Sequence, residues 1–158
     1  MLETLGSSQI SALIRSELWG WPLALTLHAF GTALVLGLIF IISLRLLGMF
    51  ELIPYSSLNR LFPIVWGALA LQLASGLVLW IAKPAQYAAD GAFLLKVLLI
   101  VVGIVMTANL SKMLAREGAS WESNGSIPAR GLRIVATTLV VWCVVLVAGR
   151  LTGYLGSI

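Results

Sequence analysis

Charged residues are scarce in this chain. Aspartate, glutamate, lysine and arginine make up 10% of its 158 residues, whereas hydrophobic residues make up 60%, and the mean hydropathy is +1.04. Soluble domains carry about 25% charged residues and about 45–50% apolar residues. A bilayer accepts apolar side chains on the lipid-facing side of every helix, which water does not. The composition therefore excludes an ordinary soluble domain and favours an integral membrane protein.

Residues that commonly bind metals or act in catalysis are few. Cys143 is the only cysteine and His28 is the only histidine. A single chain therefore has no intrachain disulfide, no CxxC zinc cluster and no bis-histidine haem site. The GxSxG, HExxH and P-loop patterns are absent, and no pair of carboxylates lies within an apolar segment. These absences favour a protein that is not an enzyme.

Four apolar segments follow one another along the chain, each close to the ~20 residues that cross the hydrocarbon core. We expect these spans at residues 21–44, 62–82, 92–110 and 134–154. Between them we expect a loop with Pro54, a short polar turn at 83–91, and a helical extension that becomes a loop near Gly118. The sequence thus predicts an all-α, four-helix transmembrane bundle that forms one domain, residues 21–158.

The N-terminal segment, residues 1–20, has a different pattern. Ile10, Leu13, Ile14 and Leu18 fall on one helical face. This pattern predicts a short amphipathic helix that lies in the membrane interface. The segment lacks the basic start, apolar run and small-residue cleavage site of a signal peptide. We therefore expect the first span to act as an uncleaved insertion signal.

The distribution of lysine and arginine predicts the orientation, because cytoplasmic loops are enriched in these residues. Six of the ten lie in the first and third loops: Arg45, Arg60, Lys112, Arg116, Arg130 and Arg133. We therefore expect these loops in the cytoplasm, both termini in the periplasm, and the protein in a bacterial inner membrane. The net charge is +4, but the basic residues lie between the apolar segments and form no continuous stripe of the kind that binds nucleic acid.

Three ionisable residues within the spans are candidates for a binding site, because such residues are costly in a membrane. His28, Lys96 and Arg150 are all expected at a similar depth near the periplasmic surface. We predict that they share one pocket and bind a cofactor, with His28 as the candidate metal ligand. The alternatives remain open: His28 can bond a neighbouring helix or contact a proton or quinone, and Lys96 and Arg150 can extend to the interface.

Small residues predict where the helices pack against one another. Ala29, Ala33 and Gly37 recur at a spacing of four residues on the first span, and Gly149 and Gly153 form a GxxxG pattern on the fourth. Helix contacts within lipid favour such residues because they let backbones approach closely. Gln72 and Ser75 are polar residues in the second span, and we expect them to form hydrogen bonds between helices.

The order of these residues resembles an uncharacterised bacterial family of small four-helix membrane proteins. The resemblance rests on SELWGWPLALTLHAFGTALVLG, SLRLLG, SGLVLWIAKPAQY, FLLKVLLIVVGIVMTANL and VVLVAGRLTGY, and it covers roughly residues 16–156. It implies the four-helix fold and assigns no reaction.

A more distant resemblance is to the membrane domain of copper resistance protein D. That domain has a histidine early in one helix, a Ser/Thr-Gly-Leu in the next helix and a Leu-Lys at the start of the third. The matching residues in this chain are His28, Gly76 and Lys96. This resemblance implies a role in copper or redox chemistry at the periplasmic face.

The preferred interpretation is a non-enzymatic membrane protein that binds a ligand, metal or cofactor in a periplasm-facing pocket, or that serves as an accessory subunit of a redox or transport complex. One alternative is an electron-transfer subunit that binds b-type haem or quinone. For haem, a homodimer would supply two copies of His28. Another alternative is a structural assembly subunit without a ligand.

Overall fold

The computed structural model describes residues 19–82 and 84–155, and every regular element within them is a helix. The prediction of an all-α, four-helix bundle is confirmed. The interfacial helix expected in the N-terminal segment falls on residues 1–18, which lie outside the described residues. The four long helices are α3 (Gly20–Leu46), α5 (Phe62–Ala82), α7 (Gly91–Asn124) and α8 (Ala129–Leu155). The short helices are α4 (Tyr55–Leu58), η1 (Asn59–Leu61) and α6 (Pro84–Ala89).

All four long helices are long and apolar enough to cross a membrane. Large apolar side chains on their outer faces, such as Leu23, Leu77, Leu98 and Val140, are more than half exposed. A soluble protein rarely presents so much contiguous apolar surface to water. The protein is therefore a multi-pass membrane protein whose outer surface contacts lipid.

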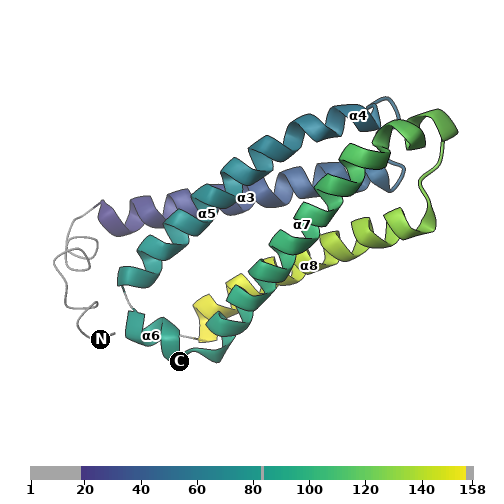
Figure 1. The fold of residues 1–158 in the computed structure, drawn as a ribbon. Helices are drawn as coiled ribbons and strands as arrows, with labels where there is room; N and C mark the ends of the chain where they lie inside the picture. Colours follow the sequence, from purple (N-terminus) through teal and green to yellow (C-terminus); the bar gives the residue numbers. More distant parts are fainter. Residues whose placement is uncertain (1–18, 83, 156–158) are drawn as a thin grey trace.

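The bundle consists of two helix pairs. Helix α3 packs mainly against α5, and α7 packs mainly against α8, while α4 with α7 and α3 with α8 join the pairs. Figure 1 shows that the first turns of α3 and the last turns of α8 lie apart. The pairs thus separate toward this end of the bundle.

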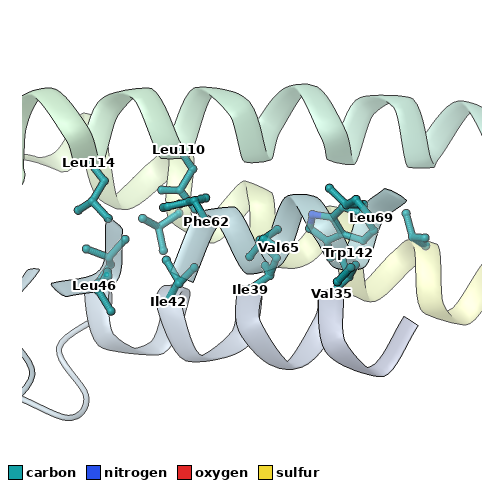
Figure 2. Packing of buried hydrophobic residues seen from close by; sticks show 14 of the residues in the cluster. Val35, Ile39, Ile42, Leu46, Phe62, Val65, Leu69, Leu110, Leu114 and Trp142 are labelled. Carbon is teal, nitrogen blue, oxygen red and sulfur yellow. The ribbon is translucent and has the colours of Figure 1, made fainter. Parts of the chain in front are cut away.

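The hydrophobic core fills the other half of the bundle. Ile39, Ile42 and Val65 are fully buried there, and Leu46 lies near Leu114 of α7 (Figure 2). This core fixes the four helices relative to one another by burying apolar surface.

Three core residues lie together on the side of the separated helix ends. Figure 2 shows that Val35, Leu69 and Trp142 gather there from α3, α5 and α8. The core is therefore well packed at one end of the bundle and continues past these three side chains only to Val145 of α8.

Helix α7 continues well beyond the expected span. Its 34 residues give a length of about 51 Å, whereas the hydrocarbon core is about 30 Å thick. The expectation of a loop near Gly118 is wrong: the helix ends at Asn124 and is capped by Gly125, which has a φ of +65°. A glycine within a helix costs about 1 kcal/mol, and the burial of Leu114 and Trp121 on either side of Gly118 outweighs this cost.

The segment expected as a polar turn at 83–91 contains the short helix α6. Pro84 stands at its first position, where proline needs no N–H donor. Asp90 then caps α7, because its carboxylate accepts a hydrogen bond from the Ala92 N–H at 2.9 Å. A proline and a capping aspartate in this short connection therefore start two successive helices.

The small residues of α3 pack differently from the expectation. Ala29, Ala33 and Gly37 are exposed rather than packed against a neighbouring helix. A Cβ at Gly37 would meet no atom within 4 Å. Gly31 instead marks the close approach to α5, since a Cβ there would lie 3.2 Å from the backbone of Gln72. The four-residue spacing of small residues therefore predicts the wrong face of α3, because the face that contacts α5 contains Gly31.

Candidate functional site

A cavity of about 330 Å³ lies between the two helix pairs at their separated end. We call it the His28 cavity. It extends along α3 from Leu25 to Leu36, a rise of about 16 Å. Its deep end is closed by the core residues Val35, Leu69 and Trp142. The polar side chains that line it are His28, Thr32, Gln72, Lys96 and Arg150.

The His28 ring is held against α5 by both of its nitrogens. Nδ1 lies 3.1 Å from Oγ of Ser75, and Nε2 lies 3.1 Å from Nε2 of Gln72. The Thr32 hydroxyl lies 3.0 Å from Oε1 of Gln72, which extends the network back to α3. The hydrogen bonds expected between helices at Gln72 and Ser75 therefore meet at His28.

The two orientations of the Gln72 amide assign the ring protons differently. With the amide as described, its NH2 donates to Nε2 of His28, so Nδ1 carries the proton and donates to Ser75. With the amide turned over, Nε2 of His28 carries the proton, and Nδ1 accepts from the Ser75 hydroxyl only when that hydroxyl gives up the hydrogen bond that it donates to the Leu71 carbonyl oxygen at 2.7 Å. In both arrangements each ring nitrogen already has a partner on α5.

A glycine lets the imidazole approach α5 closely. A Cβ at Gly76 would lie 3.1 Å from Cε1 and 3.5 Å from Nδ1 of His28, which is tighter than an ordinary contact. The sequence Ser75-Gly76 thus supplies a hydrogen-bond partner for the ring and the space in which the ring lies.

Lys96 crosses from α7 toward α8. A Cβ at Gly149 would lie 3.5 Å from Cε and 3.7 Å from Nζ of Lys96. The end of the lysine side chain therefore lies over a glycine of the neighbouring helix instead of extending along the lipid-facing surface. Arg150, the next residue on α8, is exposed and also lines the cavity.

The charges of the cavity are of one sign. No aspartate or glutamate is among the described residues that line it. The carboxylate of Asp90, six residues before Lys96, caps the first turn of α7. Glu17, the acidic residue before the first span, lies outside the described residues. Ammonium and guanidinium groups only donate hydrogen bonds, so these two side chains suit a molecule that supplies acceptor atoms such as oxygens.

The donor set fits a metal ion or haem poorly. Neither nitrogen of His28 has a free lone pair, since each already has a partner on α5. Among the described residues, no group of three His, Cys, Asp or Glu side chains comes together. Met106 and Met113, which are possible soft ligands, line a separate groove beside Lys112 at the other end of the bundle. Ligation by His28 would therefore require the loss of a hydrogen bond to Gln72 or Ser75.

The structure thus brings His28, Lys96 and Arg150 to one cavity and adds Thr32, Gln72 and Trp142, which the sequence did not single out as site residues. A signal for Thr32 and Gln72 exists: both are polar residues within apolar helices, as His28 is. Trp142 carries no such signal. Comparisons of the chain with models of known families, with curated proteins and with solved structures find no match. The resemblances stated above therefore remain predictions.

Proposed function

We propose that this membrane protein binds a small amphipathic ligand in the His28 cavity, and that the head group of this ligand carries an anionic or carbonyl oxygen. In this proposal Lys96 and Arg150 contact the head group. His28 shapes the wall between them and α5 and is not a metal ligand. The protein has no catalytic residue in this proposal and acts as a binding or accessory subunit.

One observation carries the proposal: among the residues that the structure describes, the cavity combines apolar walls with two cations and no acidic lining residue. A ligand with an apolar body would contact side chains such as Leu36, Ile100 and Leu146. Ligand sites in proteins are mostly apolar and contain a few polar groups that orient the ligand. Long-chain carboxylates and quinones both have an apolar body and acceptor oxygens.

The depth of the polar groups supports the same ligand class. Lys96 lies in the second turn of α7, and Arg150 lies near the end of α8, so both are close to one membrane surface. An amphipathic molecule in a bilayer has its head group at this level and its apolar part deeper. With both termini in the periplasm of a bacterial inner membrane, the cavity would open near the periplasmic surface.

Photo-crosslinking tests the proposal. A fatty acid with a terminal diazirine is added to the full chain in lipid nanodiscs, and the labelled peptides are mapped by mass spectrometry. We expect labels to concentrate on the deep walls of the cavity, around Val35 and Trp142. We expect at least about a tenfold loss of labelling there in the double variant Lys96→Met and Arg150→Gln, since even one lost hydrogen bond to a charged group removes about 1.5–3 kcal/mol of binding free energy.

A matched variant and a competitor sharpen this test. Lys112→Met removes one exposed lysine of α7 at the opposite end of the bundle and should leave the labelling unchanged. A short-chain quinone that displaces the label would favour a carbonyl head group over a carboxylate. Labelling that is spread over the lipid-facing residues and is equal in the wild type and the double variant would contradict the proposal.

A further inference from the structure

A second depression lies at the other end of the bundle, between the extension of α7 and the first turns of α8. We call it the basic groove, and its volume is about 340 Å³. Its polar lining includes Lys112 and Arg116 of α7 and Arg130 of α8. Glu117 is the one acidic residue among the described residues that line it. The lining charges therefore sum to about +2 at neutral pH.

These cations have no partner within the part of the chain that the structure describes. Lys112, Arg116 and Arg130 form no ion pair and no side-chain hydrogen bond to the described residues. Arg45, at the same end of the bundle, is different: it donates to the carbonyl oxygen of Ile53 and, at 3.1 Å, to that of Glu51, and it stacks on Tyr55. Arg45 thus holds a loop, whereas the groove cations remain available to an external anion.

The depth of the groove matches the boundary between acyl chains and head groups. If the hydrocarbon core begins at Gly91, the first ~20 residues of α7 cross it and Lys112 is level with the membrane surface. Met106 and Ile134 line the groove on the side of the hydrocarbon core. The groove is therefore apolar where lipid tails lie and cationic where phosphates lie.

We propose that the basic groove binds an anionic phospholipid, whose headgroup phosphate contacts Lys112, Arg116 and Arg130 and whose first acyl carbons contact Met106 and Ile134. Basic pockets between transmembrane helices commonly bind anionic headgroups in this manner. A zwitterionic lipid would bring its own ammonium group beside three cations, so the groove selects against it. This proposal is independent of the ligand in the His28 cavity.

Native mass spectrometry of the full chain tests the proposal. The protein is released from micelles that contain equal amounts of phosphatidylglycerol and phosphatidylcholine. We expect the wild type to retain one phosphatidylglycerol in clear preference to phosphatidylcholine. The double variant Arg116→Gln and Arg130→Gln should bind it about 25-fold more weakly, because each cation near a membrane surface contributes about fivefold.

Two further variants separate the groove from general electrostatics. Arg60→Gln with Arg133→Gln also removes two exposed arginines from this end of the bundle, but neither residue lines the groove, so binding should be retained. Glu117→Gln removes the acidic residue of the groove and should tighten binding. This gain cannot result from misfolding.

Three outcomes would overturn the proposal. The first is equal retention of phosphatidylglycerol and phosphatidylcholine by the wild type. The second is an equal loss of binding in the two double-arginine variants. The third is equally tight binding of free glycerol phosphate, since the groove would then recognise a soluble phosphate ester without any contribution from the acyl chains.

Discussion

The indole Nε1 of Trp142 donates a hydrogen bond of 3.0 Å to Oγ1 of Thr107 and so ties α8 to α7. The Thr107 hydroxyl in turn donates to the carbonyl oxygen of Gly103 at 2.8 Å. A Cβ at Gly103 would lie 3.1 Å from two carbons of the indole, so the ring needs a glycine at this position. Because Trp142 also lines the His28 cavity, these three residues fix one of its walls.

Thr107→Val should lower the free energy of unfolding by about 1–2 kcal/mol, because it leaves a buried indole N–H without an acceptor. Thermal unfolding in detergent, followed by circular dichroism, measures the loss. Thr137→Val is the matched control, since the exposed Thr137 bonds only to the backbone of its own helix. Equal melting temperatures for the two variants would contradict the expected role of the hydrogen bond.

Gly31→Ala should separate α3 from α5. The added Cβ would lie 2.9 Å from Oε1 and 3.2 Å from the backbone of Gln72, and backbone cannot move away as a side-chain end can. Overpacking of this kind costs about 1–3 kcal/mol. Gly37→Ala, on the same helix, meets no atom within 4 Å and should raise the free energy of unfolding by up to about 1 kcal/mol. Equal melting temperatures for the two variants would show that α3 and α5 do not pack closely at Gly31.

His28→Ala should lower the stability of the bundle and change no optical spectrum. The substitution removes two hydrogen bonds to α5 and leaves the partners, Gln72 and Ser75, inside an apolar bundle, at a cost of about 1–3 kcal/mol. Ser75→Ala, which removes the partner of Nδ1 alone, should cost less. We expect no Soret band in the purified wild type, because neither ring nitrogen is free to bind haem iron.

The contrary result is equally definite. A Soret band in the wild type that His28→Ala abolishes, together with an unchanged melting curve, would show that His28 is a haem ligand. In that case the hydrogen bond to Gln72 or Ser75 would have to break when haem binds. The electron-transfer alternative would then replace the proposed function.

The sequence predicted the helices well because bilayer thickness imposes a length on each apolar run. The spans expected at 62–82 and 92–110 lie within α5 and α7 for this reason. The predicted end near Gly118 failed because a helix outside the membrane depends on packing: Leu114 and Trp121 are buried on either side of the glycine. No local signal in the sequence reports such burial.

The candidate site was harder to predict than the fold. His28 and Lys96 stand out in the sequence because an ionisable side chain inside a membrane is energetically costly. Their positions along the expected spans indicate that the two residues lie at the same depth. The partners depend on how α3 and α5 are rotated about their axes. Gly31, rather than the regularly spaced Ala29 and Ala33, sets that rotation. Trp142 could not be chosen from six tryptophans without the contact to Thr107.

The orientation of the bundle can be tested with introduced cysteines. In a Cys143→Ser background, Ser123→Cys lies at the basic end of α7, and Ala88→Cys lies in α6 at the opposite end. We expect Ala88→Cys to react with a membrane-impermeant thiol reagent in intact cells and Ser123→Cys to react only after lysis, because lysine and arginine accumulate in cytoplasmic loops.

The opposite labelling pattern would invert the bundle. The His28 cavity would then open to the cytoplasm, and the basic groove would contact the outer leaflet. Both binding proposals would keep their residues, because each depends on depth and charge rather than on the side of the membrane. Only the source of the ligand would change. Reaction of both cysteines in intact cells would instead show that the four helices do not all cross the bilayer.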